Sequence, residues 1–321
     1  MTNSNLSFHF FEDTESDLHE YIFNISKDSL ELILNHHFAL ISVITSILIF
    51  LACIIGIVGN GITIWILGVC MKRNPFTTYI LNLAIADIGV LITVISLYIL
   101  PFLFSGNLPI WGICICSYVQ SLMYITDQLI LTVVSIDRCV AVLFPIWHRC
   151  HRPPRLSSIV CVCIWVFSCL ISGLDILLTF ANQFILLQFI VNVAICTPLM
   201  AVSTVILFVK IYTKSQQHQR GKLLTVIVLA LFFFLIFGFP MNYFYFLIYY
   251  YFSDGIDLMS LLMAALGCAV LNCNVNPVVY FLVGRKKKGR SRLSMKVALQ
   301  RVFTDEEICG GQQGTRAETQ F

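Results

Sequence analysis

The stretch SIDRCVAVLFPIWHRCHRP, residues 135–153, joins the end of a long apolar run to a basic, aromatic loop that contains proline. The charged pair Asp137 and Arg138 lies at the end of that run. Ionisable side chains at the edge of lipid are costly, and they are starting points in the search for a functional site. The pair is therefore the first candidate site in this chain, with a plain cluster of charges at a helix end as the alternative.

The composition excludes a soluble globular protein. Of 321 residues, 58% are hydrophobic and only 12% are charged, against about 25% charged residues in average soluble domains. A soluble fold of this length could not bury so much apolar surface, so most of the chain is expected to lie in lipid. The 13 cysteines fall mostly inside apolar runs, where cysteine behaves as a small hydrophobic residue.

Seven apolar runs are each long enough to cross a bilayer, which takes about 20 helical residues. Lipid admits only helices or closed barrels, and continuous rather than alternating runs predict helices. The fold class is therefore an all-α membrane protein, a seven-transmembrane helix bundle. The runs cover residues 38–70, 76–103, 112–143, 157–179, 185–212, 222–252 and 258–284.

The distribution of charge predicts the orientation in the membrane. Of 20 lysines and arginines, only Lys27 lies on the N-terminal side. The others lie in the odd-numbered connections, at the adjoining helix ends or in the C-terminal tail. Basic residues are in excess in cytoplasmic loops, so the N-terminus is predicted outside and the C-terminus inside. Two sequons, at Asn5 and Asn24, then lie on the outer side, where they can be glycosylated.

These boundaries divide the chain into four parts. Residues 1–37 form an acidic extracellular segment, and residues 38–284 form the seven-transmembrane domain. Residues 285–303 mix basic and apolar side chains. They predict an amphipathic eighth helix on the inner leaflet, with a disordered basic tail as the alternative. Residues 304–321 form a polar cytoplasmic tail.

Polar residues inside the runs share one depth in the predicted bundle. At a rise of 1.5 Å per residue, each lies roughly 12–18 Å above the inner end of its helix. Polar groups in hydrocarbon must face one another or ordered water, so these side chains are predicted to cluster. They are Asn60, Asp87, Asp127, Asn272 and Asn276.

Two members of this level are carboxylates, Asp87 and Asp127. If they lie about 4 Å apart, they repel by about 4 kcal/mol at an effective dielectric near 20. Either one of them is protonated, or a cation lies between them. Two interpretations stay open: a strong sodium or proton site, and a neutral Asp127 that acts as a structural hydrogen-bonding group.

Seven short motifs follow one another along the runs: Gly59 with Asn60, LNLAIAD ending at Asp87, Asp137-Arg138-Cys139, Trp165, Pro198, Pro240 and NPVVY at 276–280. In this order and on these helices, they resemble the rhodopsin-like class of G-protein-coupled receptors. Longer stretches narrow the resemblance: KRNPFTTYILNLAIAD at 72–87, LFPIWHRCHRP at 143–153, FLIFGFPM at 234–241 and YFLVG at 280–284. They are similar to the Mas-related receptors, in which a glycine like Gly238 replaces a tryptophan that most of the class keeps.

The resemblance implies a multi-pass receptor of the plasma membrane that converts an extracellular ligand into activation of a heterotrimeric G protein. It implies that helix six moves outward, that the ligand is a basic peptide or amine, and that arrestin and receptor kinases are further partners beside the lipid bilayer. The residues expected to serve coupling and switching are Asp137, Arg138, Cys139, Pro145, Ile146, Trp147, Pro240, Asn276, Pro277 and Tyr280.

The resemblance also bears on ions, ligand and disulfides. The class holds a sodium ion around the helix-two aspartate, so an allosteric Na⁺ that favours the inactive state is expected at Asp87 and Asp127, with no other metal or cofactor. Asp175, roughly 28 Å above the inner end of its helix, is the expected partner of a cationic ligand, although a water-facing helix end explains it equally. The usual disulfide is not expected, because residues 178–188 lack a cysteine to pair with Cys114 or Cys116.

Other functions are weighed against the receptor. An enzyme is not expected, since the chain has no glycine-rich phosphate loop, no HExxH and no Ser-His-Asp grouping in its loops, and no nucleic-acid partner is expected. A transporter or channel stays open, because the polar level could form an ion path. A receptor-like modulator of partner receptors, without a ligand of its own, also stays open.

Overall fold

The computed structural model describes residues 36–71, 74–103, 109–153, 155–181, 187–213, 228–229, 231–238, 240, 242–243 and 258–284. These residues are helical almost throughout and include no strand, so the all-helical prediction is confirmed for them. The chain before residue 36, the expected eighth helix at 285–303, the tail and the sequons Asn5 and Asn24 lie outside the described residues.

The helices begin and end close to the predicted runs. The first covers His36–Cys70 and finishes in a π-helical turn, η1 (Ile66–Cys70). The others are α2 (Pro75–Leu103), α3 (Ile110–Leu143), α4 (Pro145–Cys150), α5 (Leu156–Phe180), α6 (Leu187–Ile190), η2 (Val191–Cys196), α7 (Thr197–Thr213) and α9 (Leu258–Gly284). Three consecutive elements, α6, η2 and α7, together match the fifth predicted run. Of the sixth run, residues 231–238 are described as helical.

Contacts divide the chain into the compact units Met1–Leu48 and Ile49–Phe321. The described part of the first unit, residues 36–48, is helical with mostly exposed side chains. The candidate site residues named from the sequence that the structure describes all lie in the second unit.

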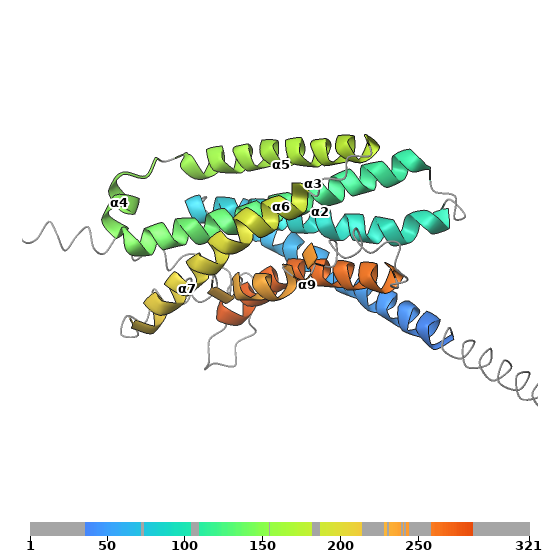
Figure 1. Ribbon diagram of the computed structural model, residues 1–321. Coiled ribbons are helices and arrows are strands. Elements are labelled where there is room, and N and C mark those ends of the chain that lie inside the picture. The colour runs from blue at the N-terminus through green and yellow to red at the C-terminus, as the bar shows by residue number, and fades with distance from the viewer. Residues whose placement is uncertain are drawn as a thin grey trace, which may run out of the picture. The chain divides into compact units, whose positions relative to one another are not determined.

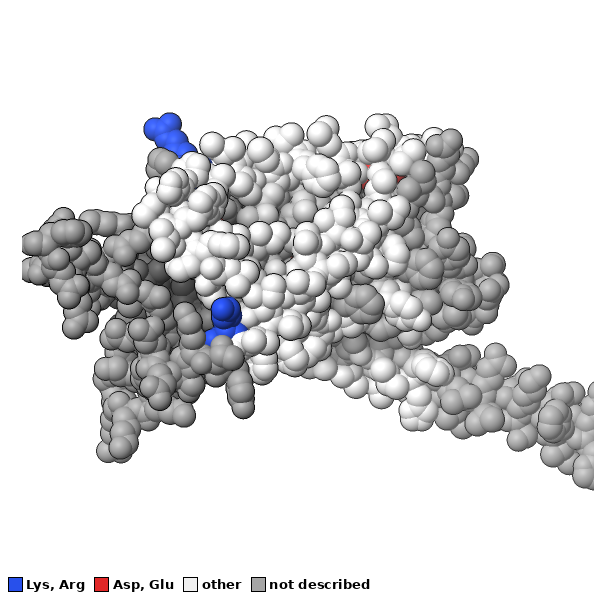
Figure 2. Space-filling view, turned by 60° about the vertical axis from the view of Figure 1, so that its left-hand side comes forward, with Lys and Arg blue, Asp and Glu red and all other residues white. Residues whose placement is uncertain are grey.

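Five of the described helical stretches are long and apolar enough to cross a membrane: His36–Cys70, Pro75–Leu97, Leu156–Leu178, Leu187–Lys210 and Ser260–Phe281. Large apolar side chains on them, such as Leu170 and Val205, are exposed. The face drawn in Figure 2 is almost free of charged side chains among the residues that are coloured there. Such surfaces suit contact with lipid tails.

Helix α3 is the central element of the second unit. It packs against α2, α5 and α7, and α2 packs in turn against α5 and α9. Figure 1 shows α3 running beside α5 and α2, with α7 crossing it. Residues of α3 enter both clusters of buried apolar side chains, one around Leu131 and Tyr280 and the other around Tyr124 and Leu91. The polar residues of α3 therefore face other helices.

Local sequence explains how the helices at the inner end begin. Asn74 caps α2, because its Oδ1 accepts a hydrogen bond from the backbone N–H of Thr77 at 2.7 Å. The turn from α3 to α4 is made at Phe144, which leaves the helical conformation at φ −123° and ψ 63°. Pro145 then opens α4, a position that suits proline because no backbone N–H is needed there.

The first helix approaches its neighbours closely at Gly56. A Cβ atom there would lie 2.7 Å from Leu91 Cδ1 and 3.0 Å from the side-chain amide of Asn274. By contrast, a Cβ atom at Gly61, on the same helix, would meet nothing within 4 Å. The space for a side chain is thus restricted at Gly56 and open at Gly61.

We expect Gly56→Ala to lower the stability of the protein by about 1–3 kcal/mol, because an added methyl group overpacks this contact. The measurement is the thermal unfolding midpoint of the detergent-solubilised protein. Gly61→Ala is the matched control and should leave the midpoint unchanged or raise it slightly, since alanine favours helix. Equal midpoints for the two variants would contradict the close approach at Gly56.

Candidate functional site

Asp137 and Arg138 close α3 at its inner end. Arg138 Nη2 lies 2.8 Å from Asp137 Oδ2, and the Arg138 side chain is only 6% exposed. Its guanidinium carbon lies 4.5 Å from the centre of the Phe76 ring of α2, within the range of a cation–π interaction. Tyr280 of α9 is buried in the same apolar cluster as Phe76. The structure therefore places the candidate switch arginine in a nearly buried position between α2 and α3.

A second arginine binds the same carboxylate. Arg152, in the connection between α4 and α5, places Nη2 2.9 Å from Asp137 Oδ1 and Nη1 3.5 Å from Asp137 Oδ2. Its Nη2 also donates to Ser157 Oγ of α5 at 2.9 Å. Sequence reasoning treated Arg152 only as one of many inner basic residues and missed this contact. The proline-containing basic loop was the only signal for it.

His148 of α4 completes this cluster. Arg152 Nη1 lies 2.8 Å from His148 Nε2, and Asp137 Oδ1 lies 3.5 Å from the same nitrogen. A guanidinium is always a donor, so the contact with Arg152 is a hydrogen bond in the neutral form of His148 that carries its proton on Nδ1. Burial lowers the pKa of His148; Asp137 opposes this shift, whereas Arg152 and Arg138 add to it.

The expected coupling residues fall into two groups. Ile146 and Trp147 are exposed on the short helix α4, at 78% and 49%, so they are accessible to a partner. Cys139, by contrast, is buried, and its Sγ lies 3.5 Å from the backbone carbonyl of Ser203 in α7. Cys139 therefore contacts α7 rather than the cytoplasmic surface.

The polar level predicted from the sequence forms a cluster in the structure. Asn276 donates to Asp87 Oδ2 at 3.1 Å, and Asn272 donates to Asp127 Oδ2 at 3.0 Å. Asn60 donates to a backbone carbonyl of α9 at 3.0 Å. All of these side chains are at most 4% exposed. Four helices, the first, α2, α3 and α9, are thus tied together at one depth.

The two carboxyl groups of this level, Asp87 of α2 and Asp127 of α3, are neighbours that bind Asn276 and Asn272 of the same helix, α9. Among the described residues, no N–H or O–H donor reaches the second oxygens, Asp87 Oδ1 and Asp127 Oδ1, although both are buried. Free carboxylate oxygens facing a second carboxylate require a shared proton or a cation. An oxygen donor set of this kind fits a hard cation such as Na⁺.

A hydrogen-bonded network surrounds Gly238, where the class usually has tryptophan. Tyr124 of α3 donates to the Gly238 carbonyl at 3.2 Å, and Asn242 donates both to Tyr124 Oη at 3.1 Å and to the same carbonyl at 2.9 Å. Asn192 of η2 donates to Asn242 Oδ1 at 3.1 Å. From the sequence, only the replacement of a tryptophan typical of the class was evident at Gly238. The structure adds a polar connection between α3, η2 and this helix.

A side chain at position 238 would also clash with the ring of Phe234. The absent side chain thus lets the ring of Phe234 occupy the space beside Gly238. The signal in the sequence was the loss of a large aromatic residue, which requires other residues to fill its volume.

Asp175 lies in the outer part of α5 and is half-buried. Its Oδ1 accepts a hydrogen bond from the backbone N–H of Leu187 at 3.4 Å, so it joins α5 to the start of α6. The cysteines near the expected disulfide position, Cys114 and Cys116, are free, as are all twelve cysteines of the described ranges.

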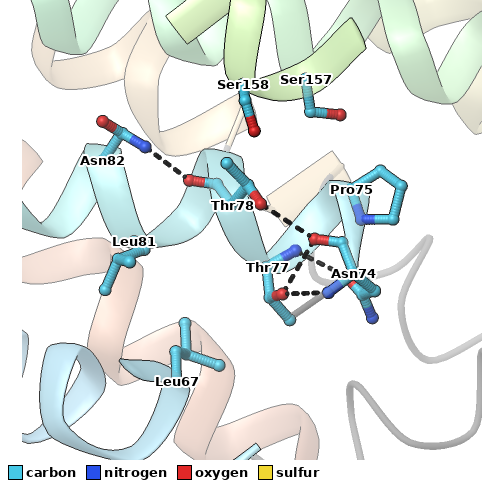
Figure 3. Close-up of a pocket in the computed structure, with 9 residues that line it drawn as sticks. All are labelled: Leu67, Asn74, Pro75, Thr77, Thr78, Leu81, Asn82, Ser157 and Ser158. Carbon is cyan, nitrogen blue, oxygen red and sulfur yellow. Dashed lines mark hydrogen bonds between the residues drawn. The ribbon is translucent and has the colours of Figure 1, made fainter. Parts of the chain in front are cut away.

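A polar cavity of about 250 Å³ lies where the inner ends of α2 and α5 meet (Figure 3). Its lining is mainly hydroxyl and amide groups: Leu67, Asn74, Pro75, Thr77, Thr78, Leu81, Asn82, Ser157 and Ser158. Ser157 also accepts the hydrogen bond from Arg152. The cavity lies at the opposite end of α5 from Asp175, so it is not the site expected for an extracellular ligand.

Comparison with known proteins agrees with the motifs. Residues 59–185 match the family described as 7 transmembrane receptor (rhodopsin family). The chain is 38% identical over 275 residues to the proto-oncogene Mas of Rattus norvegicus, covering 81% of this chain and 83% of that protein. It is 34% identical to Mas-related G-protein coupled receptor member H of the same species, over 84% of this chain and 85% of that protein. Member D of Macaca fascicularis is 32% identical, over 90% and 96% of the two chains.

Proposed function

Since the chain belongs to the rhodopsin family of seven-transmembrane receptors, in its Mas-related group, we propose that it converts binding of an extracellular ligand into activation of a heterotrimeric G protein through Arg138. Membership of this family makes the chain a multi-pass receptor of the plasma membrane and not an enzyme. The ligand, the coupling and the movement of helix six belong to the proposal.

The position of Arg138 carries the proposal. It is nearly buried at the inner end of the central helix, and the Asp137 carboxylate and the Phe76 ring that hold it are both close to the cytoplasmic surface. When the helix that contains Pro240 moves outward, Arg138 can leave Asp137 for a docked partner. The exposed Ile146 and Trp147 of α4 give that partner an apolar contact. Arrestin and receptor kinases would dock at the same inner face.

Helix six is proposed to bend at Pro240, where the proline ring disrupts helical hydrogen bonding. The network at Gly238 supports this location, because Tyr124 and Asn242 both bind the carbonyl of the residue two positions before the proline. Within α9, Pro277 is a second place where a helix can bend. Tyr280, one turn beyond Pro277, would then turn toward Arg138 and support it in the active arrangement.

We further propose that Asp87 and Asp127 bind a sodium ion or share a proton, and that either one favours the inactive state. The unbonded oxygens Asp87 Oδ1 and Asp127 Oδ1 would hold the cation, while Asn276 and Asn272 orient the other oxygens. A bound cation neutralises repulsion between the carboxylates and so stabilises the arrangement in which α2, α3 and α9 are close.

Asp175 is proposed as the anchor for a basic ligand. Its carboxylate is half-buried near the outer end of α5, where Oδ1 accepts a hydrogen bond from the backbone N–H of Leu187. A carboxylate in such a place attracts a ligand amine or guanidinium. Its contact with α6 would also transmit the presence of the ligand to the fifth run.

We expect Arg138→Ala to remove G-protein signalling, because no other group in this position can replace its contact with the partner. Calcium release and cyclic AMP are measured in cells expressing the receptor, at rest and during a screen of basic peptides and amines. Surface staining of an N-terminal tag controls for expression. The receptor function is wrong if no compound acts and Arg138→Ala leaves every basal signal unchanged. Ionic current without G protein would instead favour the transporter or channel.

We expect Asp127→Asn to abolish the effect of sodium and protons on basal signalling. In intact cells expressing the unchanged receptor, raising external sodium or lowering external pH should reduce basal signalling, because both neutralise the pair of carboxylates, Asp87 and Asp127. With asparagine at position 127 the repulsion between two carboxylates is gone, and the response should be flat. Equal responses of the two proteins would exclude the pair Asp87 and Asp127 as the site at which sodium or protons act.

We expect Asp175→Asn to weaken cationic agonists found in the screen by about tenfold, a loss of roughly 1.4 kcal/mol of charge-assisted binding. The asparagine can still accept the hydrogen bond from Leu187, so the link to α6 is retained. Concentration–response curves measure the change, and an uncharged agonist serves as control. Unchanged potency of the cationic agonists would place their anchor elsewhere.

A further inference from the structure

Two arginines share the carboxylate of Asp137, and only one of them has a role in the proposed function. Arg138 lies 2.8 Å from Oδ2, and Arg152 lies 2.9 Å from Oδ1. The side chains of all three residues are at most 10% exposed. A nearly buried carboxylate needs one cationic partner, so the second arginine requires an explanation.

The charges of this group do not balance. With His148 neutral, the described ion pairs join one negative charge, that of Asp137, to the two positive charges of Arg138 and Arg152. Removal of one arginine would leave a neutral pair, and removal of both would leave a buried carboxylate unpaired, which is strongly unfavourable. The arrangement therefore tolerates the departure of one arginine.

The surroundings of the two arginines indicate which one remains. Arg152 also donates to Ser157 Oγ of α5 and to His148 Nε2 of α4, and neither of these contacts involves Arg138. These two neutral acceptors keep the guanidinium of Arg152 in place beside Asp137 when its neighbour moves. Arg138, by contrast, is the residue that the proposed function moves toward the partner.

We propose that Arg152 takes over the Asp137 carboxylate when Arg138 is released to the G protein, and that it thereby makes release of Arg138 easier. Arg152 is thus a positioning residue, which acts through Asp137 and need not touch the partner. This inference rests on the proposed function and assigns a regulator to the same site. Without Arg152, and with His148 neutral, each release of Arg138 would leave Asp137 without a cation among the described residues, in a nearly buried position.

His148 gives the proposed role of Arg152 a dependence on pH that a purely structural role would lack. In the neutral form its Nε2 accepts from Arg152; in the protonated form Nε2 becomes a donor, 3.5 Å from Asp137 Oδ1. A protonated His148 can therefore replace Arg152 as the cation on Asp137. The charged groups that face His148 are Asp137 and Arg138 of α3 and Arg152 of the α4–α5 connection. Because Arg152 helps to lower the pKa of His148, its removal makes this protonation easier.

The test compares Arg152→Gln and Arg152→Lys with Arg155→Gln as the matched control. Arg155 lies three residues further along the same connection and is exposed. Guanine-nucleotide exchange on added Gq or Gi heterotrimers is measured in isolated membranes at equal receptor density. We expect Arg152→Gln to lower exchange about fivefold, Arg152→Lys to restore part of it, and Arg155→Gln to match the unchanged receptor.

A second arm varies the pH on both faces of the membrane fragments from about 8 to about 6, the range in which histidine titrates. Each exchange rate is divided by that of Arg155→Gln at the same pH. This division removes the effects of pH on the G protein and on the buried pair Asp87 and Asp127. We expect Arg152→Gln to regain exchange as the pH falls, because His148 becomes charged. The double variant Arg152→Gln with His148→Phe should regain none.

Several results would overturn the inference. In the first arm, Arg152→Gln would exchange nucleotide as fast as Arg155→Gln or faster. In the second arm, the double variant that lacks His148 would still regain exchange at low pH. Arg138→Ala separates this failure from failure of the proposed function. If Arg138→Ala abolishes exchange while Arg152→Gln matches the control, only the role of Arg152 is wrong. Exchange by the unchanged receptor no greater than in membranes without it would overturn both.

Discussion

The structure depends on the need of α3 to neutralise its charged groups without water. The helix passes through a lipid-facing bundle and carries Asp127 at mid-depth and Asp137 at its inner end, both nearly buried. Neither carboxylate can remain isolated at such positions. The elements packed around α3 supply partners for both: α9 donates the amide of Asn272 to Asp127, and the α4–α5 connection places the guanidinium of Arg152 beside Asp137.

The fold was largely predictable because lipid imposes continuous apolar runs. The third run, predicted at 112–143, is observed as Ile110–Leu143, since helix ends in membranes follow the switch from apolar to polar residues. The contact between Asp87 and Asn276 was equally accessible, because a fixed rise per residue assigns both side chains to one depth. Depth, however, says nothing about which atom donates and which oxygen remains without a partner.

The binding of Asp137 by two arginines and the network at Gly238 could not be predicted in the same way. The position of Arg152 depends on the break at Phe144 and on the short helix α4, which reverse the chain toward α3. No periodicity encodes that path. At Gly238 the decisive fact is a missing side chain: the ring of Phe234, one helical turn earlier, takes its volume, and Tyr124 of α3 binds the Gly238 carbonyl. Such compensation is a property of packing, and a single sequence states only that it is needed.

The two levels of α3 carry charge imbalances of opposite sign. At the level of Asp127 two carboxyl groups lie beside the amides of Asn272 and Asn276, and a proton or a cation is proposed to stabilise that level. At Asp137 one carboxylate meets two arginines, so that level becomes stable when one arginine finds an acceptor elsewhere. The carboxyl end of a partner helix, with its unpaired carbonyl groups and negative dipole, is an acceptor of this kind. Ten residues separate the two levels, roughly 15 Å along one rigid helix. Because the helix is continuous between them, a displacement of α3 that loosens the upper acid pair would also move the lower arginine.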